Sequence, residues 1–152
     1  MRPNDVNVPL FLHVLGAMLL VGTLLVVALA LLAGRRRDAA DTVALTRFGL
    51  RTLLIGVVPS YILMRVGAQW TESAEDLPEV VEDSAWLGIG YITADAGILL
   101  LVISIVLAVI GLRRLGRPEG GGTGAARAVG VISTLLLVAY LVAVWAMSAK
   151  PD

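Results

Sequence analysis

The sequence predicts an all-α integral membrane protein, in which residues 1–152 form one domain built as a bundle of four transmembrane helices. Hydrophobic residues make up 58% of the chain, and the mean hydropathy is +0.88. The apolar residues fall in four blocks, 8–33, 48–68, 86–112 and 128–148. A block of about 18 or more apolar residues can cross a bilayer, and backbone polar groups in lipid must be satisfied within a helix.

The first block is predicted to be a retained helix rather than a cleaved signal peptide. Its apolar run is about 26 residues long, whereas the apolar core of a signal peptide has roughly 7–15. The arginines at 35–37 also follow the block instead of preceding it. Residues 28–30, Ala-Leu-Ala, have the small residues of a cleavage site, but the length of the run argues against cleavage.

The second block contains a proline, and small residues at helix-packing spacing occur from the second block onward. Pro59 leaves the carbonyl of Ile55 without its usual helical partner, so we expect a kink there. Small residues four apart allow helices to approach closely, and they recur at Gly56 and Ser60, Gly90 and Ala94, and Ala126 and Gly130.

Charged residues are sorted between the connections, and this sorting predicts the orientation. Eight of the twelve basic residues lie in the connections 34–47 and 113–127, whereas the acidic loop 69–85 carries six acids and no base. Cytoplasmic loops are enriched in Lys and Arg. The three tryptophans all fall at the opposite level, where indole rings favour the headgroup region. The expected topology is therefore N-out/C-out, with the acidic loop outside.

Composition also restricts the class of protein. The chain has no cysteine, which excludes disulfides, cysteine-ligated zinc, iron–sulfur clusters and covalent haem attachment. No nucleophile–base pair, phosphate loop or metal-binding motif favours a hydrolase or a nucleotide enzyme, and the basic connections are too short to predict nucleic-acid binding. Eleven arginines against one lysine, with many Ala, Val, Leu and Gly, indicate a GC-rich bacterial genome. We therefore expect a multi-pass protein of a bacterial plasma membrane, surrounded by lipid and able to form a homo-oligomer or join a partner subunit.

Ionisable side chains within the apolar blocks are candidate functional residues, because charge is costly in lipid. They are His13, Arg51, Arg65 and Asp95. Arg51 lies near the cytoplasmic end of its block, where its long side chain can reach the interface. The other three lie roughly 7–13 Å below the outer ends of their helices, at a rise of about 1.5 Å per residue. His13, Arg65 and Asp95 therefore share one layer.

Helical spacing predicts which faces meet in this layer. Tyr61 and Arg65 lie four residues apart, as do Tyr91 and Asp95. The simplest assembly turns both faces and His13 inward and pairs Arg65 with Asp95. An imidazole needs a hydrogen-bond partner where water is scarce, and Gly16 lets a neighbouring helix supply one from Tyr61, Tyr91 or Asp95. The predicted ligand-binding pocket in the outer half of the bundle is lined by His13, Tyr61, Arg65, Tyr91 and Asp95.

The stretch "LHVLGAMLLVG" resembles the opening helix of small bacterial membrane families of the copper-resistance protein D (CopD-like) type. Haem-binding four-helix protoporphyrinogen oxidases (HemJ-like) open similarly, and there the resemblance implies that His13 is a haem ligand. The chain has no second histidine, so a haem would need Met64, Met147, a homodimer partner or five-coordination. This departure favours relatives without an assigned activity and predicts no stoichiometric haem.

Three functions remain open at this point. The first is a binding or transport-related membrane protein that uses the polar pocket. The second is an accessory or assembly subunit in which Arg65 and Asp95 are structural. The third, ranked last, is a haem- or copper-linked redox protein using His13. Imidazole and methionine suit Cu(I), but His13, Met64 and Met147 give only one ligand per helix.

The topology can be tested by labelling cysteines placed in opposite connections. The charge pattern predicts that cysteines at Glu79 and Thr123 react from opposite sides of the membrane. In intact cells, a membrane-impermeant maleimide should label the Glu79→Cys variant and spare the Thr123→Cys variant. Labelling of both from outside would rule out the predicted topology.

Overall fold

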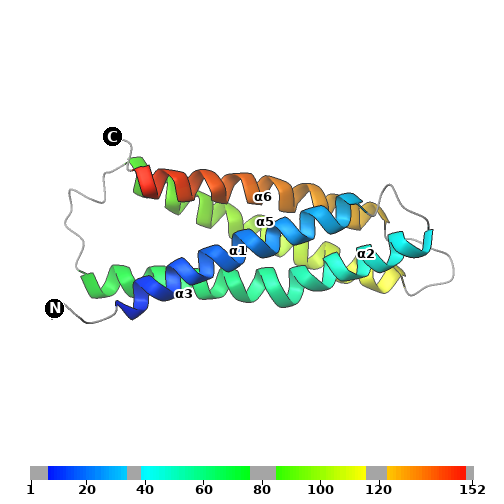
Figure 1. Ribbon diagram of the computed structural model, residues 1–152, viewed down its shortest axis with the longest axis horizontal. Coiled ribbons are helices and arrows are strands. Elements are labelled where there is room, and N and C mark those ends of the chain that lie inside the picture. Colours follow the sequence, from blue (N-terminus) through cyan, green and yellow to red (C-terminus); the bar gives the residue numbers. More distant parts are fainter. Residues whose placement is uncertain (1–6, 34–38, 76–84, 116–122, 150–152) are drawn as a thin grey trace.

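The structure, a computed structural model, describes residues 7–33, 39–75, 85–115 and 123–149, and these residues are almost entirely helical. In chain order the elements are α1 (Val8–Ala33), α2 (Ala39–Thr52), the π-helical turn η2 (Leu53–Val57), α3 (Val58–Glu75), α5 (Ala85–Leu115) and α6 (Thr123–Ala149) (Figure 1). Four spans, with α2, η2 and α3 forming one of them, are long and apolar enough to cross a membrane. The predicted all-α four-helix class is therefore confirmed.

The second transmembrane helix is longer than the sequence predicts. The expected block covered 48–68, with loops on both sides, whereas helix runs from Ala39 to Glu75 through η2. Hydropathy marks only the part of a helix that lies in hydrocarbon, and polar helical turns can continue beyond it. Asp41 in the first turn of α2 favours such an extension, because an acid there complements the helix dipole. Of the predicted acidic loop, 76–84 lies outside the described residues.

The irregularity expected at Pro59 takes the form of η2. The N–H of Val58 donates to the carbonyl of Leu53, five residues back, instead of four. A proline has no N–H to give, so the helix before it widens by one residue per turn. The Ser60 hydroxyl then donates to the Gly56 carbonyl at 2.7 Å, which supplies a hydrogen bond within the disturbed turn.

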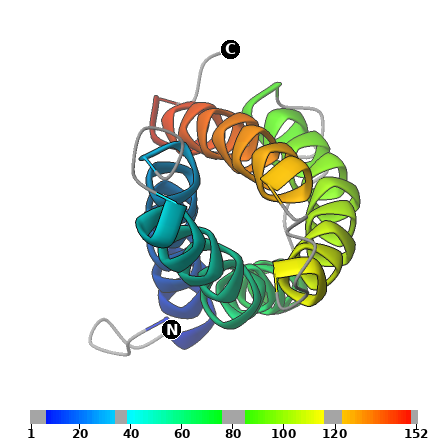
Figure 2. The same ribbon diagram turned by 90° about the vertical axis from the view of Figure 1, so that its right-hand side faces the viewer.

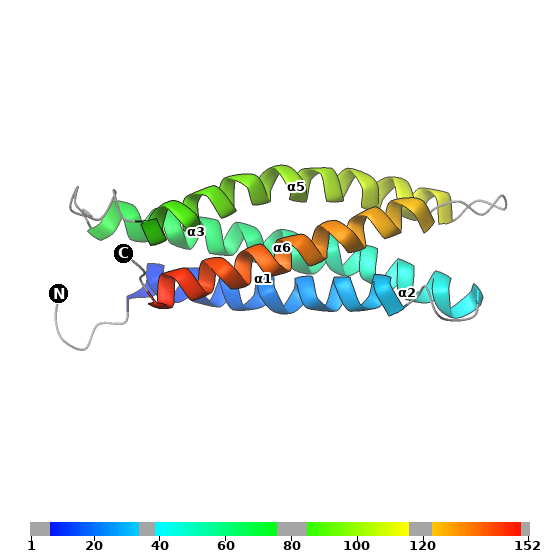
Figure 3. The ribbon, with the colours of Figure 1, turned by 90° about the horizontal axis from the view of Figure 1, so that it is seen from above.

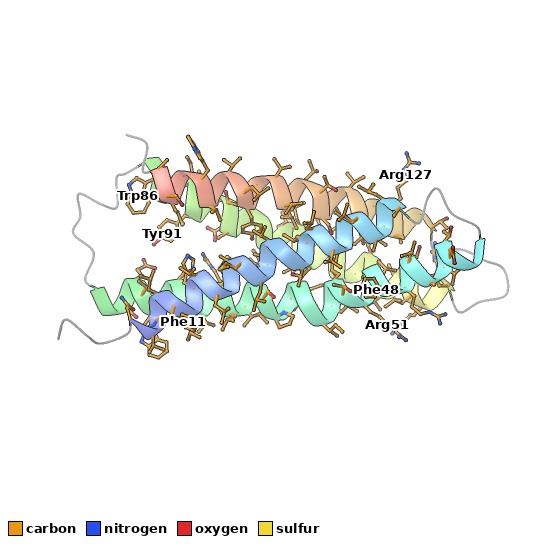
Figure 4. All side chains as sticks on the ribbon, viewed as in Figure 1. Phe11, Phe48, Arg51, Trp86, Tyr91 and Arg127 are labelled. Atoms are coloured by element: carbon orange, nitrogen blue, oxygen red, sulfur yellow. The ribbon has the colours of Figure 1, made fainter. Side chains whose placement is uncertain are left out.

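The two ends of the bundle differ in their side chains. The starts of α1 and α5 and the last residues of α3 and α6 lie together on one side of the bundle (Figure 1). This side carries the three tryptophans and is called the tryptophan end below. The opposite end, the arginine end, carries Arg51 and Arg127 (Figure 4) together with Arg47, Arg113 and Arg114. Arg51 is exposed there, as a side chain that reaches the interface must be.

The four spans form a ring (Figure 2), in which α1 packs between α3 and α6, and α5 packs on α6. Helix α6 crosses α1 at an angle (Figure 3), and the two helices are in contact. The ring closes at the arginine end, where α2 contacts α5 and α6. Its apolar core is made of Leu20, Leu24, Val27, Leu31, Leu50, Leu53, Val57, Leu101, Val129 and Leu136.

Two glycines bring α1 and α3 together almost backbone to backbone. A methyl group on Gly16 would collide with the backbone of Met64, because the methyl carbon would lie 2.6 Å from the Met64 Cα. A methyl group on Gly67 would lie 2.8 Å from the Cα of His13. Small residues permit this approach, and dispersion contacts then hold helices together where lipid gives little hydrophobic drive.

Helices α5 and α6 pack through a seven-residue repeat. Gly90 faces Met147, and seven residues further along α5, Gly97 faces the Tyr140 hydroxyl. One more step of seven reaches Ser104 on α5 and, counting back from Tyr140, Ser133 on α6. Both serine hydroxyls are fully buried and have no hydrogen-bond partner in the described part of the chain. Small residues on α5 therefore receive the larger side chains of α6.

Alanine substitutions at two glycines test the close contact of α1 with α3. Gly67→Ala should lower the free energy of unfolding by about 1–3 kcal/mol, because the added methyl group overlaps the His13 backbone. Gly22→Ala is the matched control, since a methyl group there meets open space. The measurement is the thermal midpoint in detergent. Equal midpoints for the two variants would mean that α1 and α3 are further apart.

Candidate functional site

Helices α3 and α5 are joined by side chains rather than by close backbone packing. The α1–α3 and α5–α6 pairs separate towards the tryptophan end (Figure 1), and α3 hardly approaches α5 along the described residues. The Tyr61 hydroxyl crosses this space and donates to the Ala94 carbonyl at 3.0 Å. Arg65 Nη2 donates to Asp95 Oδ1 at 3.1 Å. Tyr61, Arg65, Asp95 and the Ala94 carbonyl are together called the polar seam.

The predicted Arg65–Asp95 pair is confirmed, but Asp95 does not face inward as predicted. The Asp95 side chain is 69% exposed and that of Arg65 is 29% exposed, and Tyr91 is 40% exposed. The reason lies in the packing of α5, whose buried face is its row of small residues against α6. Asp95 directly follows the buried Ala94 and is therefore turned away from that row, towards the outside of the bundle.

The surface around the ion pair is apolar. Ile62 and Val66 on α3 are 55% and 51% exposed, and Ile92 and Leu99 on α5 are 71% and 63% exposed. Arg65 lies five residues before Trp70, so it sits roughly 7 Å below the tryptophan level. Trp86 and Tyr91 lie nearer that end on α5 (Figure 4). The pair is thus a charged patch within a surface suited to lipid.

Tyr140 of α6 belongs to the same region and was missed by the sequence reasoning. It is 6% exposed, and its hydroxyl has no hydrogen-bond partner among the described residues. It lies within electrostatic range of both Tyr61 and Arg65. The sequence did contain a signal for Tyr140. Tyr140 precedes Trp145 by five residues, as Arg65 precedes Trp70, so the spacing places Tyr140 and Arg65 at a similar depth below the tryptophans. A buried hydroxyl without a partner is costly, so this atom is a candidate ligand contact.

His13 lies in the α1–α3 interface rather than in the polar seam. Its Nδ1 lies 3.0 Å from the Met64 carbonyl oxygen, so the ring faces another helix at the level of Arg65, as predicted. The partner is a backbone carbonyl, not Tyr61, Tyr91 or Asp95. The close approach at Gly16 explains this, since it brings the Met64 backbone within reach of α1.

The structure gives no support to a metal centre and places a cavity elsewhere. No three His, Cys, Asp or Glu side chains gather as metal ligands in the described ranges. A cavity of about 420 Å³ opens at the arginine end, lined by Thr42, Thr46 and Thr123 with Arg127 and apolar neighbours. None of the five residues predicted from the sequence lines it. The absence of stoichiometric haem stays a prediction, and a haem- or copper-linked protein using His13 stays the last-ranked alternative.

Comparisons with protein-family models, curated proteins and solved structures found no match to this chain.

The energetic role of the ion pair can be measured by a double-mutant cycle. Asp95→Asn should destabilise the protein more than Arg65→Gln/Asp95→Asn, because the single change leaves a lone cation in a lipid-facing surface. An unpaired charge costs roughly 2.5–3.5 kcal/mol at the bilayer centre on insertion scales and less near the interface. Thermal unfolding of the variants in one detergent gives the comparison. Equal losses for the single and the double variant would show that Asp95→Asn leaves no costly lone cation, and would contradict the pairing.

Proposed function

We propose that this chain is a multi-pass protein of a bacterial plasma membrane, with both termini outside, that binds a ligand carrying a polar head. The ligand enters sideways from the bilayer, between α3 and α5, and its head contacts the polar seam. The observation that carries the proposal is the ion pair of Arg65 and Asp95, which bridges two helices that hardly touch.

The exposure of Asp95 supports a lateral site. A carboxylate that is 69% exposed in a membrane-spanning helix has no place in pure hydrocarbon. Its single bond to Arg65 leaves most of its accepting capacity unused, because a carboxylate has about four acceptor sites. A polar ligand head, with the water it brings, would satisfy this capacity.

The hydroxyl groups beside the ion pair extend the site inward. Tyr61 is held by the Ala94 carbonyl, whereas the Tyr140 hydroxyl has no partner among the described residues. A few polar groups set in apolar walls are the usual composition of a small-molecule site. Of the predicted pocket residues, Tyr61, Arg65 and Asp95 are proposed as ligand contacts, Tyr91 as a flanking residue, and His13 as a residue that fixes α1 against α3.

An accessory or assembly subunit is the second candidate, and the same exposure of Asp95 favours it. A cation on a helix of a partner subunit could complete the pair, because unlike charges direct the association of helices in membranes. In that case the polar seam is a docking element and holds no small ligand.

Material that co-purifies with the protein tests the proposal. The protein purified in mild detergent is denatured, extracted with organic solvent, and its extract identified by mass spectrometry. At least one amphiphile should accompany the wild type and be depleted several-fold in Arg65→Gln/Asp95→Asn. Tyr140→Phe should deplete it less, because that change removes one hydroxyl only. Arg51→Gln, an exposed change at the arginine end, is the control and should retain it.

Two results would contradict ligand binding. The first is an identical extract from the wild type and the double variant, with no other change. The second is an identical extract in which the double variant has also lost a stoichiometric protein partner. The second result would favour the accessory subunit.

A further inference from the structure

We infer that the ligand of the polar seam is a zwitterionic phospholipid whose head carries a phosphate next to a primary ammonium group. This inference rests on the proposed function and specifies its ligand. It is argued from the net charge of the site, from its unused hydrogen-bonding capacity, and from its depth and surroundings.

The charge of the polar seam selects a ligand with both signs. Arg65 Nη2 and Asp95 Oδ1 are 3.1 Å apart, so the site has a cation and an anion side by side and no net charge. A purely anionic head attracted to Arg65 would be repelled by Asp95, and a purely cationic head would meet the opposite conflict. Repulsion of this kind is a source of specificity. A head with both charges satisfies both residues at once.

The hydrogen-bonding capacity of the pair matches the same head. One guanidinium nitrogen is used in the ion pair, and a guanidinium offers five N–H donors in a planar fork suited to phosphate oxygens. The second oxygen of Asp95 can accept from an ammonium group, which offers three donors.

The position of the pair suits a lipid rather than a water-soluble molecule. Exposed apolar side chains flank it on both helices, with Ile62 and Val66 on α3 and Ile92 and Leu99 on α5. Arg65 lies roughly 7 Å below the level of Trp70, and a long arginine side chain can extend towards the headgroups. The acyl chains then lie along the exposed apolar side chains of α3 and α5. The lipid head needs to sink only slightly below the headgroup region to reach the ion pair.

Lipid selectivity of the full-length protein gives the test. The protein in detergent is mixed with phosphatidylethanolamine, phosphatidylcholine or phosphatidylglycerol of identical acyl chains, and bound lipid is counted by native mass spectrometry. Retention should fall in that order, with at least a fivefold preference for phosphatidylethanolamine over phosphatidylglycerol. Phosphatidylcholine ranks second because its quaternary ammonium carries charge but no N–H donor for Asp95.

Variants connect this preference to the ion pair. Arg65→Gln/Asp95→Asn should abolish it, Arg65→Lys/Asp95→Glu should retain most of it, and Arg51→Gln should leave it unchanged. Circular dichroism and the thermal midpoint of each variant show that it is folded. Equal retention of the three lipids, a preference for phosphatidylglycerol, or an unchanged preference in the neutral double variant would each overturn the inference.

Two further results distinguish the alternatives. Free phosphoethanolamine should not displace the bound lipid at a hundredfold excess, and displacement would show that the site takes the soluble head group instead. A lipid-free dimer that dissociates in the neutral double variant would show that a second copy covers the seam. If the co-purified amphiphile depends on Arg65 and Asp95 but is not zwitterionic, this inference fails while the proposed function stands.

Discussion

The close contact between α1 and α3 at Gly16 and Gly67 determines how the rest of the bundle can be arranged. The hydrophobic effect contributes little to the association of helices in lipid, so close backbone packing must provide most of the attraction. At these two glycines the Met64 and His13 backbones come so near that even a methyl group would not fit. The His13 ring then bonds the Met64 carbonyl, which fixes the rotation of α1 against α3. That rotation sends Arg65, the residue after Met64, away from α1 and towards α5.

The small residues of α5 are used in the same way, against α6. Gly90 and Gly97 receive Met147 and Tyr140, so the face of α5 that could approach a helix most closely is already occupied. Two tightly packed pairs result, and the ring between them closes at the arginine end through α2. At the tryptophan end the long side chains of Tyr61 and Arg65 reach across to α5. The place where close packing stops is therefore the place where polar groups become available to a ligand.

The sequence was sufficient to predict the spans and the ion pair, because both follow from strong and local constraints. A carboxylate and a guanidinium at similar depth in lipid have few alternatives to pairing, and Arg65 and Asp95 were found together. The exposure of Asp95 was not predictable, since it depends on which face of α5 packs against α6. The partner of His13 was missed for a related reason: hydropathy and spacing identify side-chain partners, whereas a backbone carbonyl becomes available only where two helices approach very closely. The ends of the second span were misplaced because hydropathy does not report polar helical turns beyond the membrane.

The central claim is that the polar seam sets the spacing between α3 and α5 at the tryptophan end. Distances between spin labels at Gln69→Cys on α3 and Ile92→Cys on α5, both exposed positions, measure this spacing directly by pulsed electron paramagnetic resonance in nanodiscs. Labels at Leu99→Cys and Val142→Cys report the α5–α6 pair as a control. Introducing Arg65→Gln/Asp95→Asn should broaden and shift the first distribution and leave the second unchanged. An unchanged first distribution would show that α3 and α5 are held by other contacts, and would contradict the account.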